Sequence, residues 1–101
     1  MSHYGSKFRL IGALEREDIP LLARLIQIKN HDPISPVDKM ENNLLHLACY
    51  LGKINTLDFL TGQLRIGVNR KNRYNKQSCV HCAVKGMHYN IVVWLWEHGA
   101  D

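Results

Sequence analysis

The sequence lacks any apolar run near the roughly 20 residues that a membrane-spanning helix needs, so we expect no membrane contact by this segment. Residues 1–7 also lack the basic and then apolar layout of a secretory signal. Only three cysteines are present, and an odd number argues against a framework of disulfide bonds. These absences predict an intracellular, cytoplasmic protein whose thiols are reduced.

Groups that would carry catalysis or bind a metal are scarce as well. The sequence shows no glycine-rich phosphate loop, no paired carboxylates and no nucleophile beside a base. Cys79 and Cys82 form a C-x-x-C pattern around His81, but a structural zinc ion needs four convergent ligands. These side chains are expected to diverge, because Cys79 starts a helix and His81 points into the packed interior. We therefore expect no enzyme, no metal site and no cofactor, with both cysteines acting as packing residues.

Acidic residues are absent from residues 59–96, although acids and bases are balanced before that stretch. Its basic side chains, most of which lie in residues 69–77 (the basic loop), are Arg65, Arg70, Lys71, Arg73, Lys76 and Lys85. A basic loop raises the local potential and attracts an acidic partner, whereas the alternative is a solvated loop whose charges only maintain solubility. Nucleic acid is not the expected partner, because no recognition motif accompanies the basic residues and Tyr74.

What the sequence does contain is a pattern that occurs twice, with the two copies 35 residues apart. The first copy covers residues 43–52 around His46, and the second covers residues 78–88 around His81. A repeat of this length is typical of stacked helix pairs, in which no unit buries its apolar face alone. The sequence therefore predicts a stack of similar units.

Each copy predicts two helices. Asn43 and Ser78 are good N-cap residues for the first helix, and each lies three residues before the histidine of its copy. The second helices are expected over residues 54–64 and 89–98, where apolar side chains recur at the spacing of an amphipathic stripe. That stripe consists of Leu57, Phe59, Leu60, Ile91, Val92, Leu95 and Trp96. Residues 10–26 form a weaker third copy, in which Asp18 is the expected N-cap of the second helix.

This pattern resembles the ankyrin repeat, whose signature reads T-P-L-H-x-A-A-x-x-G-H followed by V-V-x-x-L-L-x-x-G-A-D. The last copy matches it at Ser78, His81, Ala83, Val84, His88, Ile91, Val92, Leu95, Trp96, Gly99, Ala100 and Asp101, and the middle copy at Leu45, His46, Ala48, Gly52 and Leu60. In the first copy Ile11 replaces the histidine and Glu17 the glycine, and in the last copy Met87 replaces the glycine. The resemblance implies an all-α solenoid of three stacked helix-turn-helix units with short hairpin loops, in repeats of about 7–38, 39–73 and 74–101.

The spacing of 35 residues exceeds the usual ankyrin period of about 33, so the extra length must lie in the connections. One expected place is residues 61–66, as a lengthened second helix or its exit. The other is residues 31–38, where prolines punctuate a loop and hairpin.

By the same resemblance, the exposed side of the first helices and the hairpin tips form a concave groove that binds a partner. The candidate residues are Leu47, Tyr50, Leu51, Cys82, Lys85 and Gly86 of the first helices and Arg70, Lys71, Arg73 and Tyr74 of the basic loop. Tyr50 is the best anchor, because an aromatic ring with a polar tip is enriched at interface hot spots. The alternative is that Tyr50 packs only between adjacent first helices.

The expected function is that of a protein–protein interaction module or scaffold that binds an acidic or amphipathic segment. The alternative is the N-terminal regulatory or substrate-recruiting part of a larger membrane enzyme, since residues 43–46 and 92–101 resemble repeats of ankyrin-bearing palmitoyltransferases. Val93 and Trp94 add apolar surface to the last helix, and no polar capping repeat follows it. We therefore expect the N-terminal part of a longer protein, with self-association through that face as the alternative.

Overall fold

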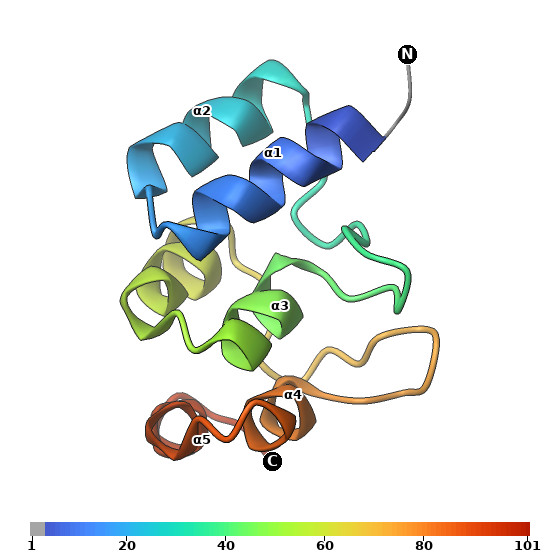
Figure 1. Cartoon of the computed structure of the whole chain (residues 1–101). Helices are drawn as coiled ribbons and strands as arrows, with labels where there is room; N and C mark the ends of the chain where they lie inside the picture. The colour runs from blue at the N-terminus through green and yellow to red at the C-terminus, as the bar shows by residue number, and fades with distance from the viewer. Residues whose placement is uncertain (1–3) are drawn as a thin grey trace.

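The computed structural model describes residues 4–101, with side chains from Lys7 onward. Three helix pairs are stacked along the chain, from blue to red in Figure 1. The pairs are α1 (Tyr4–Glu15) with α2 (Ile19–Ile28), α3 (Leu44–Leu51) with the short elements η1 (Ile54–Thr56) and η2 (Phe59–Gln63), and α4 (Cys79–Lys85) with α5 (Tyr89–Glu97). No strand occurs within the described residues, so the predicted all-α architecture of three helix pairs is confirmed.

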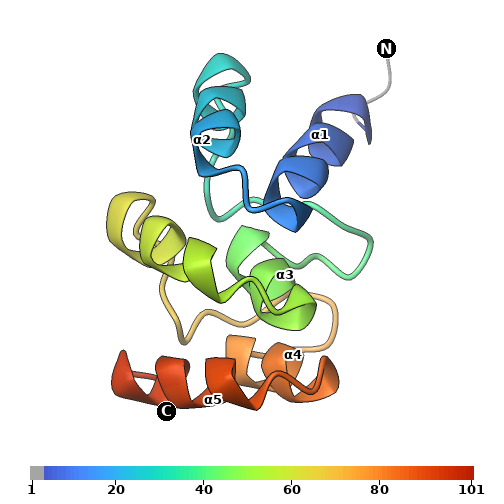
Figure 2. The same cartoon turned by 60° about the vertical axis from the view of Figure 1, so that its left-hand side comes forward.

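The first helices of the pairs, α1, α3 and α4, pack against one another in chain order, and α3 lies beside α4 (Figure 2). A continuous core runs through all three units. Its largest fully buried apolar side chains are Leu10, Leu14, Leu22, Leu44, Leu45, Leu57, Leu60, Ile66, Ile91 and Leu95. Each unit therefore depends on its neighbour for part of its apolar burial. None of the described helices is both long enough and apolar enough to cross a membrane.

The predicted N-caps are present and fix where the helices begin. The Asn43 side chain accepts a hydrogen bond from the His46 backbone N–H at 2.9 Å, and Nδ1 of His46 accepts from the Asn43 N–H at 3.2 Å. In the last unit Nδ1 of His81 accepts from the Ser78 N–H at 3.1 Å. Asp18 caps α2 by accepting from the Leu21 N–H at 3.2 Å. These local bonds satisfy N–H groups that a helix start leaves without partners.

Three turns between paired helices adopt the left-handed conformation at positions 35 residues apart: Glu17 has φ 53°, Gly52 has 79° and Met87 has 63°. Glycine suits this conformation because it has no Cβ, so the fold imposes an unfavourable backbone on Glu17 and Met87. Glu17 gains a contact in return, since its Oε2 accepts from Thr56 Oγ1 at 3.1 Å. At Gly52 a Cβ would lie 2.5 Å from the His88 ring, so any other residue would require that ring to move.

The second helix of the middle unit is irregular. This helix starts as a 3-10 turn in η1 and ends as the wider π-helical η2, where the Thr61 hydroxyl donates to the Leu57 carbonyl at 2.8 Å. A π turn takes up additional residues within an otherwise helical segment. Of residues 61–66, one of the two places where extra length is expected, the first three lie in this π turn, which ends at Gln63, and the rest form its exit.

Two side chains of the last unit are placed differently from the sequence prediction. Trp96 is 60% exposed and does not join the apolar stripe of α5, because it lies 100° of helix rotation beyond the buried Leu95. Its neighbour Trp94 is half-buried instead and stacks on the His98 ring, with 3.7 Å between ring centroids.

His81 is exposed rather than pointing into the packed interior, although its counterpart His46 in the middle unit is buried. The physical reason is that the basic loop and α4 cover His46, whereas nothing in the described chain covers His81 in the same way. That a further unit or a second copy covers this face stays a prediction.

Candidate functional site

Two loops project on the same side of the molecule, next to α3 and α4 (Figure 1). The first hairpin loop (residues 37–42) is closed by a hydrogen bond from the Val37 N–H to the Asn42 carbonyl, at 2.8 Å. The basic loop closes in the equivalent way, since the Asn72 N–H donates to the Gln77 carbonyl at 2.9 Å. The same turn is thus formed twice, 35 residues apart, by unlike side chains.

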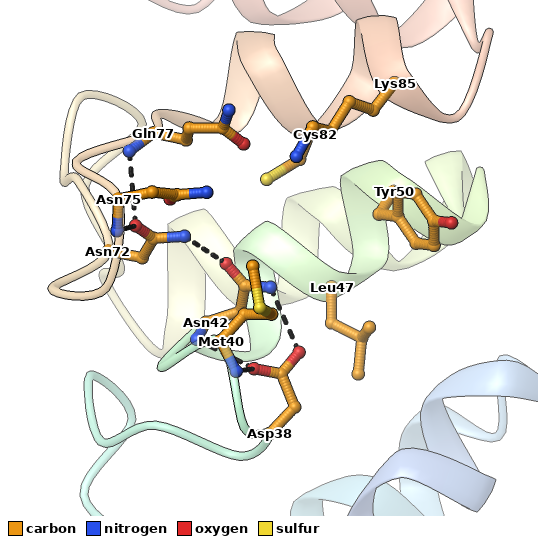
Figure 3. Close-up of a pocket in the computed structure, with 10 residues that line it drawn as sticks. All are labelled: Asp38, Met40, Asn42, Leu47, Tyr50, Asn72, Asn75, Gln77, Cys82 and Lys85. Carbon is orange, nitrogen blue, oxygen red and sulfur yellow. Dashed lines mark hydrogen bonds between the residues drawn. The ribbon is translucent and has the colours of Figure 1, made fainter.

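A polar ladder joins the two loops (Figure 3). Oδ1 of Asp38 accepts from the backbone N–H groups of Met40 and Asn42, each at 3.0 Å, and Oδ2 accepts from the Asn42 side-chain amide at 3.0 Å. Asn42 Oδ1 in turn accepts from Nδ2 of Asn72 at 2.7 Å. Asn72 is only 4% exposed, and its Oδ1 accepts from the N–H groups of two further loop residues, Asn75 and Gln77, at 3.2 Å. Because buried polar groups need partners, this ladder holds the loops in one arrangement.

His46 ties the basic loop to α3. Its Nδ1 is already an acceptor for the Asn43 N–H, so its Nε2–H donates to the Arg70 carbonyl at 2.8 Å. Burial lowers the pKa of His46 below its ordinary value of 6.5, and the bond to Arg70 opposes this effect. The neutral imidazole is therefore the form that holds the loop in place.

A groove of about 500 Å³ lies between these loops and the exposed side of α3 and α4 (Figure 3). It is lined by Asp38, Met40, Asn42, Leu47, Tyr50, Asn72, Asn75, Gln77, Cys82 and Lys85. Leu47, Tyr50 and Met40 provide apolar surface, whereas the side chains of Asn75 and Gln77 form a carboxamide wall that points into the groove (Figure 3). Tyr50 is 48% exposed, so much of its ring is accessible from the groove.

The structure brings together four of the residues proposed from the sequence, namely Leu47, Tyr50, Cys82 and Lys85. Cys82 contributes a buried thiol, and burial raises its pKa to about 12, so the thiol is neutral near pH 7. The sequence prediction missed Asn75 and Gln77, which flank Lys76 in the basic loop. In the sequence only their polarity marks these two residues, and polar residues are too common in loops to indicate a binding site.

The other proposed residues lie elsewhere. Arg70, Lys71 and Arg73 line a separate depression of about 120 Å³, which also contains the carboxylates of Asp32 and Glu41. Leu51 is half-buried and packs against the core, and Gly86 lies beneath the His88 ring. Tyr74 is exposed near the turn of the basic loop and lines neither the groove nor this depression. The groove and the basic side chains are thus two adjoining surfaces rather than one.

A basic surface lies where the chain leaves η2 and enters the basic loop. Residues 65 and 67–71 surround an open hollow there, and its charged members are Arg65, Arg70 and Lys71. No acidic side chain lines this hollow, so the basic side chains dominate its potential, although Arg70 and Lys71 also border the depression that contains Asp32 and Glu41. We call Arg65, Arg70 and Lys71 the basic surface.

The cysteines do not form a binding site for a metal ion in the described part of the chain. No group of three or more histidine, cysteine or acidic side chains is close enough to hold a metal there. Cys49, Cys79 and Cys82 are buried thiols between α3 and α4 and are not disulfide-bonded. The hydrogen bond between the Cys49 and Cys79 thiols and, after it, burial raise the pKa of Cys49. These cysteines therefore act as small packing residues.

Comparison with known proteins agrees with this geometry. The family model described as ankyrin repeats matches residues 10–101 in three copies. A search among curated proteins finds no match. The matched range covers all three helix pairs apart from the first residues of α1. The chain therefore belongs to the ankyrin-repeat family, whose repeats are generally modules of protein–protein interaction.

Proposed function

We propose that this chain binds a partner protein through the groove, and that the partner segment lies there in an extended conformation. The observation that carries the proposal is the combination of apolar floor, carboxamide wall and lysine within one cavity. Such a mixture of a few apolar contacts and convergent polar groups is typical of recognition sites. Tyr50 is the proposed anchor, since a half-exposed tyrosine can bury its ring against a partner while its hydroxyl stays hydrated.

The carboxamide wall favours an extended segment over a helix. In the described structure Asn75 and Gln77 use their backbone N–H groups within the loop, whereas their side-chain amides face the groove (Figure 3). A carboxamide offers a donor and an acceptor, which match the free N–H and C=O groups of an extended chain. A helix has already satisfied its own backbone groups, so only its side chains could pair with these amides.

Charge supports an acidic partner. Lys85 lies at the α4 side of the groove, and the basic surface adjoins the other side of the basic loop. Both oxygens of the Asp38 carboxylate bond to the first hairpin loop, so Asp38 adds negative charge on that side of the groove, away from the α4 side where Lys85 lies. An acidic segment would therefore be attracted from a distance by the basic surface and held locally by Lys85.

The rigid ladder between the loops lowers the entropic cost of binding. Asn72 and Asn42 hold the two loops at a fixed separation through a 2.7 Å hydrogen bond, so the groove does not need to form when the partner arrives. The three unpaired thiols are consistent with a reducing compartment, and we include a cytoplasmic location in the proposal.

The test uses a display library of unstructured peptides about 12 residues long, selected against the whole chain. Selected peptides should combine an apolar residue with acidic residues. Their affinity should fall by about tenfold or more for Tyr50→Ala, and further for Tyr50→Ala with Lys85→Glu. The matched control is Lys29→Glu, the same charge change at the exposed end of α2, which should bind like the wild type. Selected peptides that bind all three variants equally would show that the groove is not the binding site.

A further inference from the structure

A second concave surface lies at the opposite end of the stack from α5. The helices α1 and α2 diverge from their short connection (Figure 2), and between them is a cleft of about 370 Å³. It is lined by Phe8, Arg9, Gly12, Arg16, Leu21 and Leu25. This cleft is separate from the groove, because the two share no lining residue.

The cleft exposes apolar surface that the chain itself does not cover. Phe8 is 78% exposed, and Leu21 is half-buried, while Leu25 forms part of the floor. A phenylalanine exposed to this extent beside two leucines forms the kind of apolar patch that marks an interaction site.

Gly12 makes a notch in the wall formed by α1. A Cβ at this position would meet only the Arg16 guanidinium, at 3.6 Å, so packing within the chain does not require glycine there. Glycine in the interior of a helix is also less favourable than alanine. The missing side chain leaves room for another backbone to approach α1 closely, as small residues do where helices pack together.

The polar groups of the cleft are arginines. Arg9 and Arg16 are seven residues apart on α1, which places them two turns and about 10 Å apart on the same face. No carboxylate lines the cleft. A complementary occupant therefore carries two acidic side chains at a similar separation.

We propose that this cleft docks an amphipathic helix of a partner protein. The apolar side of that helix lies over Gly12 and Leu21 and covers Phe8, and two acidic residues seven positions apart pair with Arg9 and Arg16. A helix is favoured over an extended segment because the lining side chains offer no hydrogen-bonding groups except the guanidiniums. An extended chain would leave its N–H and C=O groups facing apolar side chains, whereas a helix bonds them internally.

A second copy of this chain does not supply such a helix. Among the described helical segments three contain an acidic residue, and each contains only one: Glu15 in α1, Asp58 between η1 and η2, and Glu97 in α5. A pair of acids two turns apart is absent from them. The occupant of the cleft is therefore assigned to a different protein.

The test uses a display library of helical peptides about 20 residues long, randomised along one face and selected against the whole chain. Selected helices should carry two acidic residues seven positions apart beside leucine or isoleucine. Their affinity should fall by about tenfold or more for Gly12→Leu and for Arg9→Glu with Arg16→Glu. Replacing the acids of the selected helix by lysines should restore binding to the Arg9→Glu, Arg16→Glu variant.

Two controls separate this proposal from the one made for the groove. Tyr50→Ala with Lys85→Glu should leave binding of the selected helices unchanged, and Gly12→Ala should fold with a melting temperature at least equal to that of the wild type. The proposal is overturned if no helix is selected, if the selected helices bind Gly12→Leu as well as the wild type, or if they lack acidic residues. It is also overturned if the apolar cleft instead drives dimerisation in sedimentation experiments, or binding to anionic lipid vesicles, that Gly12→Leu abolishes.

Discussion

His46 and His81 form a matched pair, because the same residue occupies the same helical position in two units with different surroundings. Both accept a hydrogen bond at Nδ1 from the backbone N–H three residues earlier. Only His46 also donates from Nε2 to a carbonyl of the basic loop, at 2.8 Å, and only His46 is buried, with 1% of its surface exposed. Comparing the two alanine variants therefore separates the contribution of the helix cap, which both histidines make, from that of the contact with the basic loop, which only His46 makes.

The expected losses of unfolding free energy differ by a large margin. His46→Ala removes two hydrogen bonds, each contributing about 1 kcal/mol, and leaves a buried gap whose lost packing adds about 1–2 kcal/mol. The total is about 3–4 kcal/mol. His81→Ala removes only the solvent-exposed bonds of Nδ1 to the Ser78 N–H and hydroxyl and creates no cavity, so it should cost about 0.5–1 kcal/mol.

Urea unfolding followed by circular dichroism measures both variants against the wild type. The His46→Ala midpoint should be lowered several times more than that of His81→Ala, with similar slopes in all three proteins. Equal losses would refute the reasoning, because they would mean that the contact of His46 with Arg70 contributes nothing beyond the shared cap.

Three further predictions concern pH, charge and packing. Burial lowers the pKa of His46 and of His31 below 6.5, so the unfolded chain binds more protons than the folded one in mild acid. The free energy of unfolding, measured from about pH 7 to about pH 5, should therefore decrease as the pH drops through 6.5. Replacing both histidines by glutamine should make this pH profile flatter. The double variant Arg70→Glu, Lys71→Glu should bind groove-binding acidic peptides more weakly and with a smaller salt dependence, while its melting temperature stays nearly unchanged. If it binds these peptides as tightly as the wild type, the basic surface has no part in the proposed interaction. Ala83→Leu should lower the free energy of unfolding by about 1–3 kcal/mol through overpacking, since Ala83 is fully buried, and a neutral result in urea unfolding would contradict the packing of α4.

The sequence by itself determined the local structure and its repetition. Asn43, Ser78 and Asp18 predicted the helix starts because an N-cap acts over three residues of chain. The 35-residue spacing predicted the stacking, since helices that repeat with one apolar face must share a core. The same spacing places Met87 at the position where the repeat has a glycine, and the structure shows a left-handed conformation there.

Only the tertiary structure decided which distant side chains meet. Asn42 and Asn72 are 30 residues apart and bond directly, and this contact places Asn75 and Gln77 in the groove. The sequence predicts that the arginines of the basic loop line the groove, but the turn at residues 72–77 directs carboxamides into it and leaves Arg70 on the adjoining surface. A residue's pattern of neighbours along the chain fixes its helix or turn, whereas its exposure depends on what the next unit places over it.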